Sequence, residues 1–258
     1  MKIEPEYNPS RSLSARITRR LTQWNTVEAL GQQPKRTIVS VTFDDFPKSA
    51  ANLGSQIVMD AGGRATYYAC TSLLGRENIT GEQFDESTIA FLQKDRHEIG
   101  AHSHSHLDCA IAEIDTIEAD ILLNLKRLKD MGVPRVSNFA YPFGETQVEL
   151  KRTLRTQFRT ARGILAGTNG ARSDRMQLRA LELTPNDWTF ERAAKAIRES
   201  EDSPSWVILF THDVRKSPSR YGVHPDRLKE LLQMACDINA EILTVGEAIR
   251  RLEVANDV

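Results

Sequence analysis

The chain has 258 residues, 40% of them hydrophobic and 27% charged, which is enough to bury a sizeable core as one large domain. Its 34 basic and 35 acidic side chains leave a formal net charge of −1, and this balance excludes the global field that would attract nucleic acid or an anionic membrane. Three widely spaced cysteines and a polar N-terminal region predict a cytoplasmic protein with no secretory signal and no membrane span.

In chain order, residues 1–35 are expected to form an N-terminal extension, and residues 36–258 the main domain. From residue 36 onward, short β-branched or aromatic runs alternate with longer amphipathic segments, as in a parallel sheet covered by helices. Strands are predicted at 37–43, 65–70, 97–101, 137–141, 159–163, 179–184, 206–211 and 241–244. Helices are predicted at 48–61, 86–95, 109–131, 146–156, 189–201, 225–238 and 246–253.

This pattern predicts an α/β fold, a distorted (β/α) barrel with seven or eight strands, in preference to an open doubly wound sheet. In either architecture the active site forms at the C-terminal ends of the strands. The polar or rigid residues that follow predicted strands are Asp44, Asp45, His102, Pro142 and His212. We therefore expect them to meet at one edge of the sheet.

The segment Thr42-Phe43-Asp44-Asp45 ends the first predicted strand. Two adjacent carboxylates repel unless a cation or a proton lies beside them, and a divalent metal would supply that charge. Because side chains alternate at a strand end, one carboxylate can bind metal while the other acts as a general base. The alternative is an N-cap or Asx turn at Asp45 that begins the next helix.

Four of the six histidines lie between His97 and His106. If the chain turns into a helix after the third strand, His102 and His106 share a face and His104 points away. Two imidazoles and one carboxylate leave coordination positions open, as a catalytic zinc site requires. An exposed polar turn with incidental histidines, or a His-x-His pair of His102 and His104, are the alternatives.

Two further strand ends carry candidate residues. Pro142-Phe143-Gly144 forms a rigid turn whose backbone N–H groups could face the site, although an ordinary exit from a strand is the alternative. The apolar run 206–211 delivers His212 to the same edge, where a histidine can be structural or catalytic.

With these residues assembled, the sequence resembles the polysaccharide deacetylase family, the NodB-homology domain of carbohydrate esterase family four. The family's Thr-Phe-Asp-Asp motif is intact at 42–45, and its His-Ser/Thr-x-x-His motif at 102–106. The resemblance implies that Asp44 is the general base and that Asp45, His102 and His106 bind the metal. It further implies an oxyanion donor at the Phe143 N–H after Pro142, a wall of the acetyl pocket at Trp188, and a general acid at His212.

Two supporting charges of the family pattern are missing, since Ala140 stands where the third motif has arginine and Thr184 where the fourth has aspartate. Charged groups that orient the base and the acid are therefore absent from their usual positions. Arginines that could substitute for the first are Arg162, Arg172, Arg175 and Arg179.

The function implied is metal-dependent hydrolysis of an N-acyl group, N-acetyl above all, on an amino sugar or oligosaccharide. The cofactor implied is one divalent ion, zinc first, with cobalt, nickel or manganese as alternatives. Two other functions stay open: hydrolysis of another C–N bond, such as a formyl amide or cyclic ureide on a small molecule, and a catalytically silent carbohydrate-binding module.

Overall fold

A computed structural model describes residues 13–254 of the chain. Residues 1–12 of the expected N-terminal extension, and residues 255–258, lie outside the described part. The strands are β1 (Ile38–Asp44), β2 (Thr66–Ala69), β3 (Glu77–Asn78), β4 (Gly81–Glu82), β5 (Glu98–Ala101), β6 (Asn138–Ala140), β7 (Thr160–Arg162), β8 (Leu181–Glu182), β9 (Trp206–Thr211) and β10 (Glu241–Ile242). All predicted strands are confirmed, and the short β3–β4 hairpin was not predicted.

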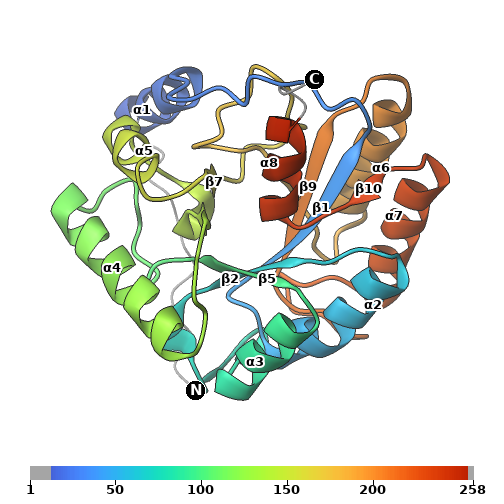
Figure 1. The fold of residues 1–258 in the computed structure, drawn as a ribbon, viewed down its shortest axis with the longest axis horizontal. Helices are drawn as coiled ribbons and strands as arrows, with labels where there is room; N and C mark the ends of the chain where they lie inside the picture. The colour runs from blue at the N-terminus through green and yellow to red at the C-terminus, as the bar shows by residue number, and fades with distance from the viewer. Residues whose placement is uncertain (1–12, 255–258) are drawn as a thin grey trace.

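The helices surround the sheet, with α8 lying across one end of it (Figure 1). They are α1 (Leu13–Trp24), α2 (Ser55–Asp60), α3 (Glu86–Lys94), α4 (Ile114–Asp130), α5 (Val148–Leu154), α6 (Asp187–Asp202), α7 (Pro225–Asp237) and α8 (Val245–Val254). A π-helical turn η1 (Ala50–Gly54) precedes α2, and 3-10 turns form η2 (Thr71–Leu73) and η3 (Pro142–Gly144). Among these helices, none is long and apolar enough to cross a membrane.

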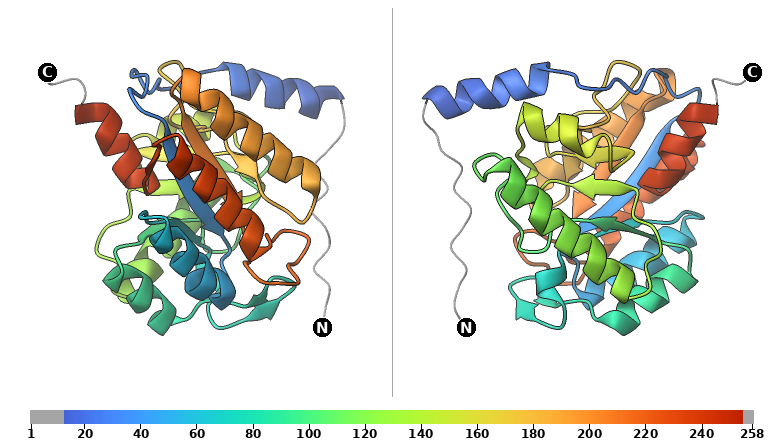
Figure 2. Two further views of the ribbon diagram at one scale, coloured as in Figure 1. Left: turned by 90° about the vertical axis from the view of Figure 1, so that its right-hand side faces the viewer. Right: turned by 60° about the vertical axis from the view of Figure 1, so that its left-hand side comes forward.

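Parallel pairing gives one eight-stranded sheet in the order β7-β6-β5-β2-β1-β9-β8, with β10 paired to the first residues of β1. A further parallel bridge joins Arg162 at the end of β7 to Leu178, just before β8. The sheet therefore curls round on itself, and the predicted distorted barrel is confirmed. Figure 2 shows the helices packed against its outer surface.

The interior of the barrel near the N-terminal ends of the strands is filled by apolar side chains and by one row of hydrogen-bonded polar side chains. Ile38, Trp206 and Ile208 pack there with Val245 and Leu252 of α8. Beside them a hydrogen-bonded chain links four successive strands through Thr66, Glu98, Asn138 and Thr160. Backbone N–H groups of Val245 and Gly246 cap this chain, which fixes α8 at the end opposite the strand termini that carry Asp45 and His102.

The N-terminal helix α1 lies alongside α5 and is joined to it by one buried amine (Figure 1). Lys151 of α5 donates to the carbonyl oxygens of Thr22 and Asn25, and pairs with Asp174 at 2.8 Å. Asp174 also accepts from the backbone of Val27 at 3.0 Å. Residues 22–28 are thereby tied to the barrel, and the expected domain boundary at residue 35 stays a prediction.

The helix predicted over 109–131 begins at Ile114 instead. Asp108 accepts from the Ala110 N–H, and the Gln147 amide donates to the carbonyl oxygens of Cys109 and Ala112. These bonds hold residues 109–112 in a turn, so the start at residue 109 was wrong. Ile111, which continued the apolar spacing, is 77% exposed.

Candidate metal centre

Three side chains from the ends of β1 and β5 converge on one point. Asp45, His102 and His106 each offer a ligand atom, and these atoms lie within 4.8 Å of one another. The His106 Nε2 to Asp45 Oδ2 distance is 3.1 Å, and the His102 Nε2 to Asp45 Oδ1 distance is 4.0 Å. Because β1 and β5 flank β2 in the sheet, Asp45 and His102, which are 57 positions apart in the chain, become neighbours.

Left-handed backbone conformations bring these side chains together. Positive φ angles occur at Asp45 (43°), Ser103 (59°), His106 (55°) and Phe143 (58°), which are four of the six non-glycine residues of this kind in the described chain. Each such residue costs free energy, and strained backbone of this type concentrates at functional sites. Residues 102–107 form no helix, so the helical turn expected to align His102 with His106 was wrong.

Helix α4 holds the histidine segment in this shape from one side. Asp120 accepts hydrogen bonds from the backbone N–H groups of His104 (2.7 Å) and Ser105 (3.0 Å). The His104 ring hydrogen bonds with the Thr71 hydroxyl at 2.9 Å. His104 therefore points away from the cluster, as predicted, and a His-x-His pair is not formed.

A buried amide one turn further along α4 fixes the same segment. The Asn124 Nδ2 donates to the carbonyl oxygens of Ser103 (2.6 Å) and Ala69 (2.9 Å), and lies 3.1 Å from the Thr71 hydroxyl. Asn124 is fully buried. It ties the loop that carries both histidines to the end of β2, a contact that the sequence did not reveal.

The electrostatics of the cluster favour a cation between its members. Burial lowers the pKa of His102, so its ring is neutral at pH 7. Its Nδ1 lies 2.8 Å from the Ala140 carbonyl oxygen, which only accepts, and the Nε2 lone pair therefore faces Asp45. Burial raises the pKa of Asp45, but His106 and His102 outweigh it, and the pKa falls well below 3.8.

The residues fit a divalent ion of zinc type. Asp45 Oδ1 is buried and has no hydrogen-bond partner within the described residues, which is costly for a carboxylate oxygen unless something else binds it. Two ligand atoms about 2.1 Å from one tetrahedral ion lie about 3.4 Å apart, and the observed 3.1 and 4.0 Å bracket this value. The N-cap alternative for Asp45 fails, because its carboxylate faces His106.

Asp44 points into the barrel beside this cluster and is nearly buried. Its Oδ2 accepts a hydrogen bond from the Nη2 of Arg162, which is fully buried. The guanidinium also donates to the Gly163 carbonyl oxygen and lies over two rings, 5.3 Å from Tyr68 and 4.9 Å from Phe210. The second oxygen, Oδ1, is buried and forms no hydrogen bond in the described structure.

The turn after β6 reaches the cluster through one aromatic ring. Phe143 adopts φ 58° and ψ 2°, and its ring meets the His106 ring edge-on at 4.3 Å. Pro142, the first residue of this turn, is buried. The structure therefore brings Pro142 and Phe143 to the same edge as the three candidate ligands.

His212 follows β9 on the same edge and contributes to lowering the pKa of Asp45. Its backbone N–H donates to the Tyr221 carbonyl oxygen, and its ring packs against Tyr221 at 5.4 Å. No carboxylate among the described residues hydrogen bonds with its ring. Asp213 is fully buried and points elsewhere, accepting from the backbone N–H and hydroxyl of Ser219.

Residues 31–160 match the family model described as polysaccharide deacetylase. The chain belongs to the polysaccharide deacetylase family. Membership indicates a carbohydrate deacetylase, and it confirms the resemblance drawn from the motifs at 42–45 and 102–106. The comparison with curated proteins gives no match.

Solved structures with this fold include known polysaccharide deacetylases. The peptidoglycan deacetylase PdaC from Bacillus subtilis is 18% identical with a TM-score of 0.55, over 87% of this chain and 95% of that one. A family 4 carbohydrate esterase from Streptomyces lividans in complex with acetate is 16% identical, with a TM-score of 0.54, over 80% and 91%. A mutant of a family 4 pseudoenzyme is 15% identical, with a TM-score of 0.58, over 84% and 68%. These likenesses establish the fold alone.

In this member of the polysaccharide deacetylase family, the two missing charges have different structural outcomes. The arginine that the family has at position 140 is replaced here by Arg162, which reaches Asp44 from the next strand. Thr184 is used locally, since its backbone N–H and hydroxyl hydrogen bond with the Thr189 hydroxyl at the start of α6. Arg172, Arg175 and Arg179 form no contact with Asp44 in the described residues.

Trp188 is the one candidate that the described contacts do not join to the cluster. It is the second residue of α6, is 57% exposed, and lies under the Arg192 guanidinium at 4.7 Å. Its segment follows β8 and so lies on the C-terminal edge of the sheet. Its place as a wall of the acetyl pocket stays a prediction.

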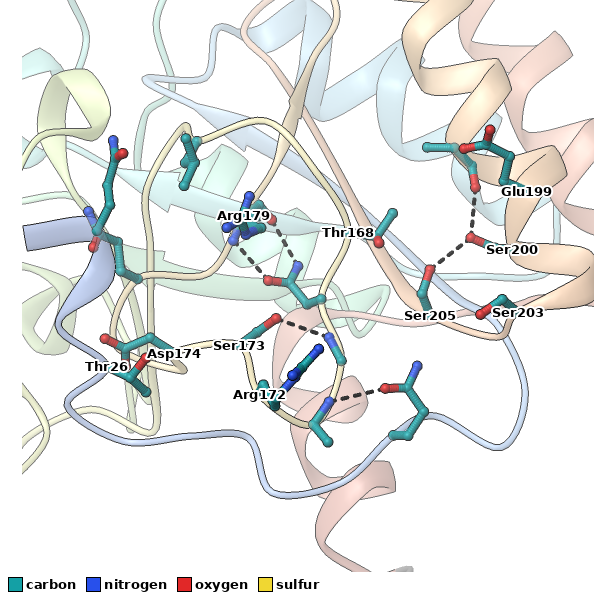
Figure 3. A pocket seen from close by; sticks show the side chains of 18 residues that line it. Thr26, Thr168, Arg172, Ser173, Asp174, Arg179, Glu199, Ser200, Ser203 and Ser205 are labelled. Atoms are coloured by element: carbon teal, nitrogen blue, oxygen red, sulfur yellow. Dashed lines mark hydrogen bonds between the residues drawn. The ribbon is translucent and has the colours of Figure 1, made fainter. Parts of the chain in front are cut away.

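A cavity of about 540 Å³ lies elsewhere, between α1, the loop 165–179 and the end of α6 (Figure 3). Ser205 lines it and directly precedes β9, whereas His212 directly follows β9. A six-residue strand spans about 20 Å, so this cavity is at the opposite end of the barrel from the cluster of Asp45, His102 and His106. Its lining includes Arg172, Arg179 and Ser200, and no buried polar atom there lacks a partner in the described structure.

Proposed function

We propose that this polysaccharide deacetylase is a metal-dependent hydrolase that removes the N-acetyl group from an amino sugar or oligosaccharide. The observation that carries the proposal is the arrangement of four side chains at one strand edge. Asp45, His102 and His106 present ligand atoms within 4.8 Å of one another. Asp44 lies next to them with one buried carboxylate oxygen that forms no hydrogen bond in the described structure.

Asp45, His102 and His106 would hold one divalent ion, with zinc preferred because one carboxylate and two imidazoles suit it. Cobalt, nickel or manganese are the alternatives. A bound ion would supply Lewis-acid polarisation of a carbonyl oxygen and of water. The Ala140 carbonyl supports this assignment, because it fixes the tautomer and the orientation of His102.

The remaining steps belong to the chain's own groups. Asp44 accepts a proton from the attacking water through Oδ1, the oxygen that Arg162 leaves uncovered. The backbone N–H of Phe143 stabilises negative charge on the former carbonyl oxygen, a contribution of about 10²–10³ in rate for one such donor. His212 protonates the departing amine. Pro142 and Trp188 shape the space for the acyl group.

A second candidate function is hydrolysis of a different C–N bond, such as a formyl amide or cyclic ureide. It is favoured by one observation: the His212 ring has no carboxylate partner in the described residues, and Thr184 bonds to Thr189 instead. A catalytically silent carbohydrate-binding module is the third possibility. The retained set of Asp44, Asp45, His102, His106 and His212 speaks against it.

The test is release of acetate from N-acetylglucosamine oligomers by the full chain loaded with zinc. We expect one zinc per chain and acetate release that Asp44→Asn abolishes while zinc still binds. Asp130→Asn, at an exposed carboxylate at the end of α4, is the matched control and should stay fully active. An active Asp44→Asn variant would contradict the proposed base.

The same assay separates the alternatives. Formate from N-formyl substrates without acetate from N-acetyl substrates would favour the second function. Stoichiometric binding of the oligomer with no product, in the zinc-loaded chain, would favour the binding module. A His212→Ala variant that keeps its zinc and its rate would move the general acid to another residue.

A further inference from the structure

The positions of Ala140 and Arg162 are equivalent in the barrel. Ala140 on β6 and Arg162 on β7 are register partners in neighbouring parallel strands. Register partners point to the same side of a sheet, and neighbouring strands lie about 4.8 Å apart. A long side chain can therefore reach the same interior point from either position.

From this geometry we infer that Arg162 is the positioning residue of Asp44, acting from β7 in place of a side chain at position 140. The inference rests on the proposed function, in which Asp44 is the base. The Arg162 guanidinium pairs with the Asp44 carboxylate from β7. The Ala140 side chain makes no such contact, and its carbonyl oxygen bonds to His102.

Burial makes the contact necessary for Asp44. A carboxylate that is 5% exposed loses most of its hydration and needs a compensating charge. Among the described residues, Arg162 is the one cation that pairs with it. Removing one member of a buried pair leaves an uncompensated charge, so Asp44 without Arg162 would turn away from its present position.

The surroundings of Arg162 limit it to this contact. Its side chain is fully buried, Nη1 donates to the Gly163 carbonyl oxygen, and the guanidinium lies over the rings of Tyr68 and Phe210. Both rings pack against the guanidinium while it contacts Asp44. Oδ2 is consequently fixed, and Oδ1 is the oxygen left to face the metal cluster.

The decisive experiment transfers the arginine from position 162 on β7 to position 140 on β6. Three variants are compared with the unmodified chain: Arg162→Ala, the double variant Ala140→Arg with Arg162→Ala, and Arg162→Lys. Each is assayed for kcat and KM with N-acetylglucosamine oligomers, for zinc content, and for the urea midpoint of unfolding. Arg179→Ala, at an exposed arginine without contact to Asp44, is the matched control.

We expect Arg162→Ala to lose about 10²-fold in kcat, as displaced reacting groups do, with KM and zinc content little changed. The double variant should have a kcat at least tenfold higher than that of Arg162→Ala. It should also regain part of the urea midpoint that Arg162→Ala loses. Arg162→Lys keeps the charge as a single point donor and should be intermediate. It also remains informative if Arg162→Ala fails to fold.

Two results would overturn the inference. One is an Arg162→Ala or Arg162→Lys variant with kcat within twofold of the unmodified chain. The other is a folded, zinc-loaded double variant that recovers neither kcat nor the urea midpoint. Failure of the proposed function looks different: the unmodified chain would release no acetate, while recovery of the urea midpoint would still support the relocated contact.

Discussion

Replacing Asn124 with alanine tests whether α4 shapes the metal site from outside it. The amide has two protons and three acceptors within 3.1 Å: the Ser103 and Ala69 carbonyl oxygens and the Thr71 hydroxyl. Two lost hydrogen bonds are worth about 0.5–1.5 kcal/mol each, and buried acceptors left without a donor add to this. We expect Asn124→Ala to lower the free energy of unfolding by about 2–4 kcal/mol.

The effect on metal binding follows from the same contacts. Ser103 has a positive φ and lies between the two candidate histidine ligands, so its release lets His102 and His106 separate. Loss of such supporting contacts weakens metal binding by about 10–100-fold. The measurements are thermal unfolding, with a shift of about 5–15 °C for this size of protein, and zinc titration by calorimetry.

Lys126→Ala, at an exposed position of the same helix, is the control and should change stability by less than about 0.5 kcal/mol. Asn124→Asp keeps the side-chain size, but its carboxylate has no N–H group to donate to the Ser103 and Ala69 carbonyl oxygens and the Thr71 hydroxyl. This variant should therefore bind zinc no better than Asn124→Ala. An Asn124→Ala variant with control-like stability and undiminished zinc affinity would refute the reasoning.

Three further predictions concern the barrel around the site. Lys151→Met removes one member of a buried pair and should destabilise the chain by about 3–5 kcal/mol in urea unfolding; an unchanged midpoint would contradict the tie between α1 and α5. Burial and the charge of Arg64 lower the pKa of His97 from 6.5 to about 4. The stability that the neutral, buried His97 ring contributes is therefore complete above pH 6.5 and is lost as the pH falls from 6.5 toward 4. His97→Asn keeps an acceptor for the Ala65 N–H and should flatten the pH dependence of unfolding by up to about 1.4 kcal/mol per pH unit; an equally steep profile would refute this. Gly100→Ala places a methyl group 2.5 Å from the Tyr68 ring, and should cost about 1–3 kcal/mol and reduce acetate release, whereas full activity would show that the ring can move freely.

The strands of the barrel were predictable from the sequence because both their faces are buried. A run such as Ile38–Asp44 is buried at every position, and continuous apolar runs of this kind are typical of parallel sheets. Helix starts were less predictable. Ile111 keeps the helical spacing, yet a side-chain amide 36 residues later in sequence, on Gln147, holds its neighbours in a turn.

The members of the candidate site were found from their order along the chain, but not how they meet. The left-handed backbone at Ser103 and His106 has no sequence signal of its own, since neither residue is glycine or asparagine. The sequence also could not show which of the four candidate arginines contacts Asp44. Choosing Arg162 requires the strand order and the register with Ala140, which pairing across the sheet determines.

The unequal outcome of the two missing charges has a physical explanation in side-chain reach. A guanidinium stands at the end of a long flexible stem, so an arginine can move to the neighbouring strand and still meet Asp44. An aspartate has a single methylene, and a shift of one strand, about 4.8 Å, takes its carboxylate out of range of His212. A relocated partner was therefore available to Asp44 and not to His212. His212 instead depends on its own loop, in which the buried Asp213 fixes Ser219 and the Tyr221 carbonyl holds the His212 backbone. The position of His212 is thus set by backbone packing, whereas that of Asp44 is set by charge.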